Sequence, residues 1–383
     1  MRLIVCLCLF AGLAFAASPS YAKTYSKDYF GETVIHRAVF EDTLVHLARS
    51  NGLGFVEMRA ANPRLDPWIP GAGVKVVLPN KHILPDAPRT GIVINLPDQR
   101  LYYFPPNGGT PLSYSIGVGR EGLNTPLGQT TVNRKIHGPT WTPTPRMRKE
   151  KPELPMSIKP FAPDNPMGTH ALYLGFPQIA IHGTDKPYGI GRRVSSGCIR
   201  MYPEGIVDLY PRIPVGTKVT VVDQPVKVGW VDDKMYVEVA PTQDQSFAIE
   251  ENGVLTDYVI TTADMKRITE KAGQHASLID WESVREAVKE HTGYPVPVLD
   301  LKRQPGQRVK DDLKYLLQEA GASHEDVKLP APEDKTQKKA QAEAPAKKET
   351  AQTIDAEPMT REVTPASSSA APRTRVHNFN VNN

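Results

Sequence analysis

The sequence predicts a multidomain protein whose largest domain is mostly β, a sandwich or partial barrel with few helices. Many short strand-like runs separated by turn residues occupy residues 89–223, which is typical of such a domain. A β-α-α-β pattern over 35–79 predicts a small α+β module ahead of it. Helices mixed with strands over 225–320 predict a mixed α/β segment, and the composition of 328–383 predicts a disordered tail.

Residues 1–22 have the features of a signal peptide. Arg2 is followed by an apolar run over 3–16, and a small-x-small cleavage site ends at Ala22. The run is shorter than the roughly 20 residues that span a bilayer, and no later segment is long and apolar enough to do so. We therefore expect an exported, soluble protein, with an uncleaved N-terminal anchor as the alternative.

The small module is expected to hold two strands with two helices between them. Asp42 and Thr43 form a helix-start signal, and Gly52 ends that helix. Pro63 ends the next one, because proline disfavours a helical conformation in the residue before it. The expected elements are strands over 34–39 and 74–79 and helices over 43–50 and 55–61.

The 89–223 domain is expected to be rich in strands and to contain one helix. Turn residues, such as those at 105–109 and 119–122, separate its apolar or alternating runs. Proline in the first turn supports a helix over 203–210. The expected strands are 91–96, 99–104, 112–118, 130–135, 171–175, 179–182 and 218–223.

The 225–320 segment carries no motif of known role. It is expected to contain a hairpin that turns at Asp232 and Asp233, three amphipathic helices and one extended stretch. The expected hairpin strands are 226–231 and 235–239, the helices are 262–272, 280–290 and 307–320, and the extended stretch is 295–298.

Charge and spacing exclude several function classes. The chain has 46 basic and 42 acidic residues, and its net charge of +4 is not gathered in one patch, which argues against a nucleic-acid-binding protein. No C-x-x-C and no H-x-x-x-H spacing is present, so we expect neither a metal site nor a cofactor.

The exported chain is expected to keep a single thiol. Cys6 and Cys8 lie in the leader, so Cys198 remains without a partner for a disulfide. His182 ends an expected strand 16 positions earlier. A histidine that accepts the thiol proton turns a cysteine into a nucleophile. The residue types alone leave a second interpretation open, in which both are ordinary core side chains.

The run Ile181–Met201, IHGTDKPYGIGRRVSSGCIRM, resembles the signature of the L,D-transpeptidases of the YkuD (ErfK/YbiS/YcfS/YnhG) family. That signature is a histidine-glycine, a spacer and S/T-x-G-C-x-R. The runs GIVINLPDQRLYYFP, IGVGREGLNTPLGQTTV, GPTWTPTPRMRKE and PDNPMGTHALYLG are similar to other segments of the family, so the resemblance extends over 89–222. Many members have histidine where this chain has Ser196, so the resemblance assigns that side chain no role.

Residues 35–79 resemble a LysM module, a binder of glycans that contain N-acetylglucosamine. The resemblance is carried by EDTLVHLARSNGLGFVEMRAANP and IPGAGVKVVLP. An unspecialised small α+β domain is the alternative.

The resemblance implies a role for each residue around the thiol. Cys198 would be the nucleophile and His182 its base, and the Gly183 carbonyl would hold the imidazole. The N–H groups of the turn at Ser196, Gly197 and Cys198 would stabilise an oxyanion. Arg200, Ser195 and Tyr188 would bind substrate or brace the loop. For Arg200, bracing is slightly favoured over binding a substrate carboxylate. Tyr188 and Trp141 are candidate pocket walls.

The same resemblance implies a periplasmic enzyme that acts on peptidoglycan. The thiolate would attack the third residue of a tetrapeptide stem, release D-alanine and pass the acyl group to an amine. That amine would be a diaminopimelate side chain, giving a cross-link, or the terminal lysine of an outer-membrane lipoprotein. Carbapenems would acylate the thiol. The alternatives are hydrolysis, as an L,D-carboxypeptidase or a lipoprotein-releasing hydrolase, and a non-catalytic wall-binding protein.

Overall fold

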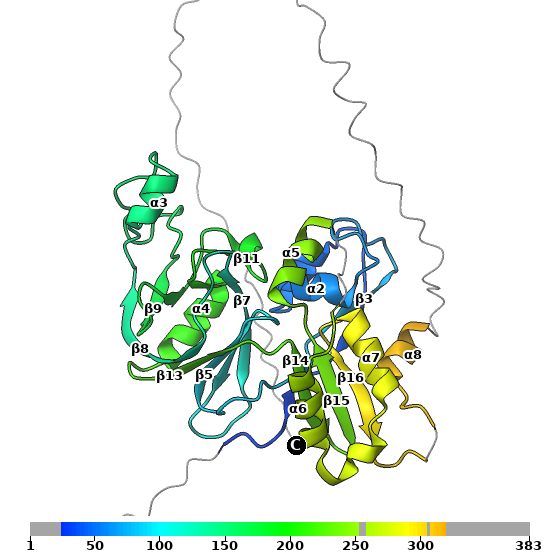
Figure 1. Ribbon diagram of the computed structural model, residues 1–383. Coiled ribbons are helices and arrows are strands. Elements are labelled where there is room, and N and C mark those ends of the chain that lie inside the picture. The colour runs from blue at the N-terminus through cyan, green and yellow to red at the C-terminus, as the bar shows by residue number, and fades with distance from the viewer. Residues whose placement is uncertain (1–23, 253–257, 305–306, 319–383) are drawn as a thin grey trace, which may run out of the picture. The chain divides into compact units, whose positions relative to one another are not determined.

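Figure 1 shows the computed structural model of the protein, which describes residues 24–252, 258–304 and 307–318. All described residues fall within one compact unit, Met1–Lys328. The expected signal peptide and the expected disordered tail lie outside the described residues.

A nine-stranded sheet forms the centre of the structure, with the strand order β11-β7-β12-β10-β9-β8-β13-β5-β6. Because β6 also pairs with β7, all strands except β11 close into a ring, so the sheet is barrel-like. This confirms the mostly-β prediction. The strands are β5 (Gly91–Asn95), β6 (Arg100–Phe104), β7 (Leu112–Gly119), β8 (Gly128–His137), β9 (His170–Leu174), β10 (Ala180–His182), β11 (Arg193–Ser195), β12 (Ile199–Met201) and β13 (Lys218–Val222).

Strand β5 shows why the central runs are continuously apolar. Ile92 and Ile94 face the main core of the ring, whereas Val93 points to the opposite face and packs with Tyr102 and Phe104. Successive side chains of a strand point to opposite faces, so a strand that is buried on both sides needs apolar residues throughout.

Three short elements of this domain were not predicted. Strands β11 and β12 have three residues each and no periodic pattern, and they form because β7 pairs with both of them. Helix α3 (Pro145–Glu150) begins at a proline, and the side chain of Thr144 accepts a hydrogen bond from the Met147 N–H at its start. The expected helix is present as α4 (Pro203–Leu209), followed by the 3₁₀ turn η2 (Tyr210–Arg212); η1 is Pro187–Gly189.

The small module has the four expected elements. The outer strands pair antiparallel, and Leu44, Leu47 and Met58 of the helices are buried beneath them. A further two-stranded pair, which was not predicted, joins residues on either side of the module. The elements are β1 (Tyr29–Phe30), β2 (Val34–Arg37), α1 (Leu44–Ser50), α2 (Phe55–Ala61), β3 (Lys75–Leu78) and β4 (His82–Ile83).

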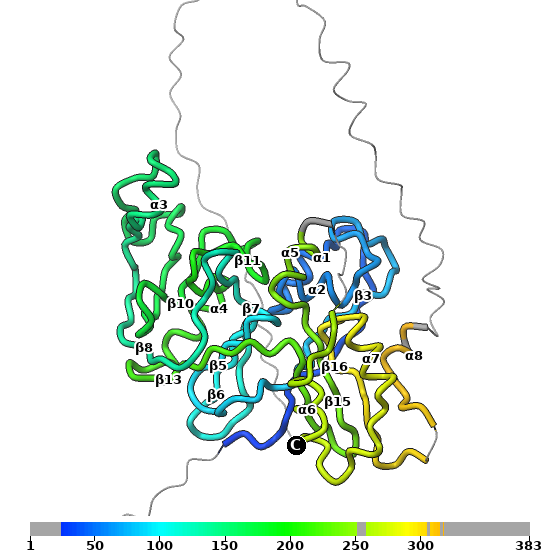
Figure 2. Tube along the Cα trace, in the orientation of Figure 1, coloured from blue at the N-terminus to red at the C-terminus, as the bar shows by residue number. Residues whose placement is uncertain are grey.

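The C-terminal segment is a three-stranded antiparallel sheet covered by helices, as the tube in Figure 2 also shows. The hairpin turns at Asp232 as expected, with that residue at a φ of 52°. The prediction of a helix over 307–320 is wrong at its N-terminus, because the helix begins at Asp312. The Asp311 carboxylate accepts the N–H groups of Leu313 and Lys314 and so caps this shorter helix. The elements are β14 (Val226–Val231), β15 (Lys234–Val239), α5 (Gln243–Asn252), α6 (Thr262–Ala272), η3 (Gly273–Leu278), α7 (Trp281–Glu290), β16 (Pro295–Asp300) and α8 (Asp312–Gln318).

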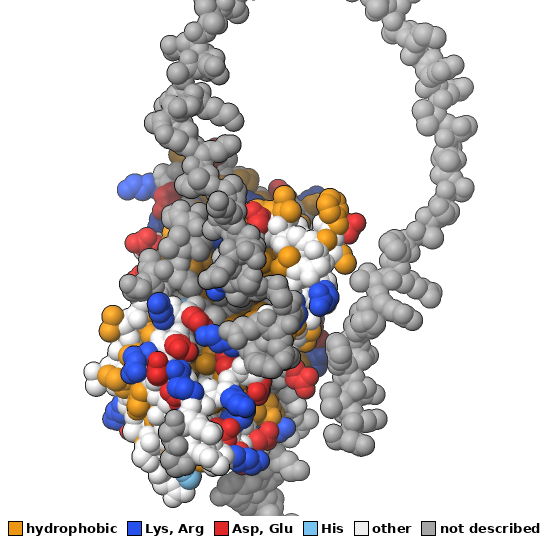
Figure 3. All heavy atoms as spheres, turned by 90° about the vertical axis from the view of Figure 1, so that its right-hand side faces the viewer, with side chains coloured by type: hydrophobic (Ala, Val, Ile, Leu, Met, Phe, Trp, Pro, Cys, Tyr) orange, Lys and Arg blue, Asp and Glu red, His pale blue; other side chains and the backbone are white. Residues whose placement is uncertain are grey.

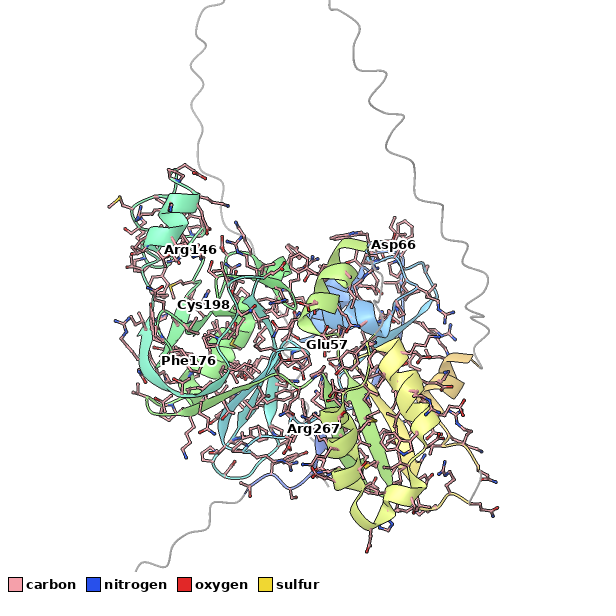
Figure 4. The ribbon with its side chains drawn as sticks, in the orientation of Figure 1. Glu57, Asp66, Arg146, Phe176, Cys198 and Arg267 are labelled. Carbon is pink, nitrogen blue, oxygen red and sulfur yellow. The ribbon has the colours of Figure 1, made fainter. Side chains whose placement is uncertain are left out.

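A buried cluster of charges joins the three parts of this unit. Glu57 of α2, labelled in Figure 4, contacts Arg100 of β6 with Oε2 at 2.8 Å from Nη1. Lys227 of β14 contacts Asp98 at 2.6 Å and Glu238 of β15 at 2.8 Å. All five side chains are buried. Because a buried charge without its partner is costly, these pairs oppose separation of the three parts.

Charged side chains of both signs are mixed on one face of the described residues. On the face shown in Figure 3, basic and acidic side chains are interspersed rather than gathered by sign. Among the described residues, no helix combines the length and the apolar character that a bilayer crossing requires.

Candidate active site

Two neighbouring parallel strands bring the expected site residues to one face of the sheet. Ile181 of β10 is the register partner of Ile199 of β12, and both are fully buried in the core. His182 is the partner of Arg200 and therefore points to the opposite face. Cys198, which directly precedes β12 and is labelled in Figure 4, lies two residues before Arg200 and shares that face. The pairing thus gathers the thiol, the imidazole and the guanidinium.

The His182 ring is held in one tautomer. Its Nδ1–H donates to the Gly183 carbonyl oxygen at 2.6 Å, as expected, which leaves Nε2 as the atom that can accept a proton. Burial, reinforced by the positive charge of Arg200, lowers the pKa of His182 to about 4. The imidazole is therefore neutral at pH 7. A Cβ at Gly183 would lie 3.1 Å from Ile206 Cγ2, a tight contact that Ile206 would have to relieve by shifting.

The Cys198 thiol rests against the start of β10. Its Sγ lies 3.5 Å from the Gln178 carbonyl oxygen. Burial raises the pKa of the Cys198 thiol, although a hydrogen bond from the Ala180 N–H and the charge of Arg200 oppose that shift. Within the described part of the chain, no hydrogen bond joins Sγ to the His182 ring. Catalytic hydrogen bonds often form only in the substrate complex.

The turn before the cysteine is organised by Ser195. Its buried hydroxyl donates to the Cys198 carbonyl oxygen at 2.5 Å and accepts the Gly197 N–H at 3.1 Å. Ser195 thus braces the loop, one of its two expected roles. The Gly197 N–H already has an acceptor, so the expected oxyanion site rests on the N–H groups of Ser196 and Cys198. Gly197 has a φ of 102°, a left-handed backbone that favours glycine.

Arg200 does not show the bracing role that was slightly favoured for it. No hydrogen bond or ion pair of its guanidinium is present within the described segments, and its buried Nε has no partner. Burial lowers the pKa of Arg200, and Asp185 opposes that shift. A half-buried guanidinium whose Nε has no protein partner is suited to a carboxylate from outside the chain.

The two aromatic candidates lie differently. Tyr188 of η1 is 69% exposed. Trp141 forms an isolated backbone bridge with Ile158, within the excursion between β8 and β9 that also carries α3. Among the described residues, no hydrogen bond joins either side chain to the thiol or the imidazole.

The sequence prediction missed Thr125, which contacts the turn, and Arg193, which holds a neighbour of Thr125. Thr125 Oγ1 donates to the Gly197 carbonyl oxygen at 2.9 Å, and Arg193 holds the neighbouring Asn124. Asn124 and Thr125 lie in the run IGVGREGLNTPLGQTTV, whose resemblance was noted but whose side chains were given no role. Across the described residues, no group of three or more His, Cys, Asp or Glu side chains is placed to hold a metal ion.

Known proteins were compared with this chain. A family model for the L,D-transpeptidase catalytic domain, YkuD, matches residues 89–221. The chain is 37% identical to the probable L,D-transpeptidase ErfK/SrfK of Escherichia coli K12 over 316 residues, which are 79% of this chain and 99% of that protein. It is 39% identical to the probable L,D-transpeptidase YbiS of E. coli K12 over 259 residues, which are 66% of this chain and 82% of that protein.

Similarity to solved structures is more limited. One match is the NMR structure of the catalytic domain from the E. faecium L,D-transpeptidase. The two chains are 23% identical, the match spans 36% of this chain and 100% of that chain, and the TM-score is 0.29.

Proposed function

Because the chain belongs to the L,D-transpeptidase family, we propose that it transfers acyl groups through a thioester on Cys198. The observation that carries this proposal is the shared sheet face of Cys198 and His182, with the imidazole neutral and its Nε2 free of hydrogen bonds to the described residues. A buried, neutral base beside a half-buried thiol whose pKa is raised favours proton transfer during attack over a preformed ion pair.

The first half of the reaction forms the thioester. Rotation of the Cys198 side chain toward the imidazole brings Sγ to the carbonyl carbon of the third residue of a tetrapeptide stem. Sγ bonds to that carbon while His182 Nε2 takes the thiol proton. The negative charge on the carbonyl oxygen is stabilised by backbone N–H groups of the turn, those of Ser196 and Cys198. The C–N bond to D-alanine then breaks, and the imidazolium returns the proton to the departing amine.

The second half transfers the acyl group. An amine attacks the thioester carbon, His182 takes a proton from it, and the C–S bond breaks to restore the Cys198 thiol. Arg200 is proposed to bind a carboxylate of the stem peptide, because its guanidinium is half-buried and has no hydrogen-bond partner among the described residues. Diaminopimelate and the terminal D-alanine both supply such a carboxylate.

The acceptor is proposed to be the diaminopimelate amine of a second stem or the terminal lysine of an outer-membrane lipoprotein. Water is the competing acceptor and would make the protein an L,D-carboxypeptidase. The products distinguish these reactions: disaccharide-tetrapeptide as the sole substrate gives dimers by transfer and tripeptides alone by hydrolysis. Addition of a lipoprotein C-terminal peptide gives a peptide-linked product only if the lysine is an acceptor.

The small module is proposed to hold the enzyme on glycan strands as a LysM module, in the periplasm after export. Its four elements match that layout, and Trp68 is exposed on its surface. Retention of the full chain on insoluble peptidoglycan measures the binding. Equal retention of wild type and Trp68→Ala would argue against a role for this side chain, and no retention of wild type would contradict the module's proposed role.

Intact-mass analysis after incubation with a carbapenem tests the proposed nucleophile. We expect one adduct on the wild-type protein and none on Cys198→Ala. An adduct of equal yield on both proteins, or none on wild type, would overturn the assignment. A folded Cys198→Ala protein, shown by its circular dichroism spectrum, is the necessary control.

A further inference from the structure

We propose that Thr125 and Arg193 are positioning residues for the Cys198 turn, and that helix α5 of the C-terminal segment is, through Arg193, a working part of the transpeptidase site. The proposal deepens the function above, because it rests on Cys198 being the nucleophile. It also gives the 225–320 segment a role that its sequence did not suggest.

Thr125 ties the residue before the nucleophile to the end of β7. Its Oγ1 donates to the Gly197 carbonyl oxygen at 2.9 Å and accepts the Gly119 N–H at 3.1 Å. The side chain is 3% exposed, so water does not replace these bonds easily. Since Gly197 has no side chain, its orientation depends on such backbone contacts. The Thr125 hydroxyl therefore fixes the peptide from which Cys198 follows.

Arg193 joins three separate elements with one guanidinium. Its Nε donates to the Gly119 carbonyl oxygen at 3.1 Å, and its Nη2 donates to Asn124 Oδ1 at 2.7 Å. Its Nη1 donates to the Gln243 carbonyl oxygen at 3.2 Å, at the start of α5. The side chain is 6% exposed. The planar guanidinium presents its donors in fixed directions, which suits three acceptors around one buried position.

Helix α5 is itself held in place on the other side. Its Glu250 carboxylate accepts the Arg193 N–H at 3.4 Å and lies 3.4 Å from Arg192 Nη1. The Arg192 guanidinium stacks over the Phe55 ring of α2 at 3.6 Å. Ile249 packs with apolar side chains of the small module, including Phe55. The loop between His182 and Cys198 is thus clamped by both neighbouring parts of the chain.

The clamp matters to catalysis because the thiol position depends on the turn. A displacement of about 1 Å at a reacting atom lowers a rate by up to about 100-fold. Among the described residues, neither Thr125 nor Arg193 forms a hydrogen bond with the thiol. Thr125 acts through the Gly197 peptide, and Arg193 acts through Asn124. Loss of either contact should therefore slow acylation without weakening the binding of the acylating agent.

Acylation of the full chain by a carbapenem, followed by intact mass at several concentrations, separates rate from binding. Thr125→Val keeps the side-chain shape but removes the hydroxyl, and Thr125→Ser keeps the hydroxyl. We expect the limiting acylation rate to fall about 10- to 100-fold in Thr125→Val, with the half-saturating concentration unchanged, and to stay within about twofold of wild type in Thr125→Ser. The limiting acylation rate of Arg193→Lys should be about 10-fold lower than that of wild type. The rate of Arg212→Lys should match wild type, because Arg212 lies in an exposed pair with Asp208.

Asn124→Ala is the second variant to use if Thr125→Val does not fold. Asn124 is exposed, and its change to alanine removes only the side-chain acceptor of Arg193. We expect about a 10-fold slower limiting rate with an unchanged melting temperature. Wild-type rates in the folded Thr125→Val, Arg193→Lys and Asn124→Ala proteins would overturn the inference while leaving Cys198 as the nucleophile. Acylation that persists in Cys198→Ala would instead overturn the proposed function itself.

Discussion

Lowering the pH from 7 to 5 should leave the acylation rate of Cys198 nearly unchanged. The reason lies in His182, whose pKa is lowered to about 4 by burial and by the charge of Arg200. The base must be neutral to accept the thiol proton, and burial keeps it neutral far into the acidic range. An exposed histidine would already be largely protonated at pH 5.

The expected size of the effect follows from the fraction of neutral imidazole. With a pKa of about 4, about 90% of the base is neutral at pH 5, whereas an ordinary histidine near 6.5 would be about 3% neutral. The two cases therefore differ by roughly 30-fold in rate at pH 5. A preformed thiolate predicts a third outcome, in which the rate falls about 10-fold for each pH unit below the thiol pKa.

The assay is the single-turnover rate of carbapenem acylation, measured by intact mass between pH 4 and pH 8 at constant ionic strength. An inflection near pH 6.5, or a continuous 10-fold fall per unit, would refute the reasoning. His182→Asn is the matched control, because its side-chain N–H can still donate to the Gly183 carbonyl but cannot act as a base. We expect it to be about 100- to 10,000-fold slower at every pH.

Folding must be checked at each pH in the same series. The unfolded chain takes up a proton on His182 as the pH falls below about 6.5, whereas the folded chain does so only near 4. This residue's contribution to stability is therefore complete above pH 6.5 and is lost progressively down to about pH 4. Circular dichroism at each pH separates a loss of fold from a loss of the base.

Three further outcomes follow from the structure. Lys227→Met should lower the free energy of unfolding in urea by about 3–5 kcal/mol, because two buried carboxylates lose their cation; unchanged stability would contradict the proposed importance of the buried cluster. Arg200→Gln should move the acid limb of the acylation profile to higher pH, because the charge that helps to lower the pKa of His182 is removed, and an unmoved limb would show that burial alone sets it. Gly197→Ala should slow acylation at least about 10-fold, because the residue has a φ of 102° and a Cβ there would lie 3.0 Å from Ile179 Cδ1; wild-type rates in this variant would mean that the turn tolerates the change.

Local residue patterns predicted most of the regular elements. The helix over 262–272 has the expected bounds, since Thr261 and Asp264 form a capping box that can be seen in the sequence. Helix α5 was missed, because its polar sequence has no clear apolar face and its burial depends on distant contacts of Ile249 with the small module. Strands β11 and β12 were missed for a similar reason, since only their pairing with β7 makes them strands.

The sequence by itself determined which atoms are available for chemistry: one thiol outside the predicted leader, one histidine 16 positions before it, and a serine-glycine turn between them. Residue type and spacing are local properties, so they can be read without a fold. Only the tertiary structure decided that Arg200 has no bracing contact within the described residues and that Arg193 ties the region of the turn to α5. Both depend on which groups strand pairing and helix packing bring within hydrogen-bonding distance, and no local pattern encodes that distance.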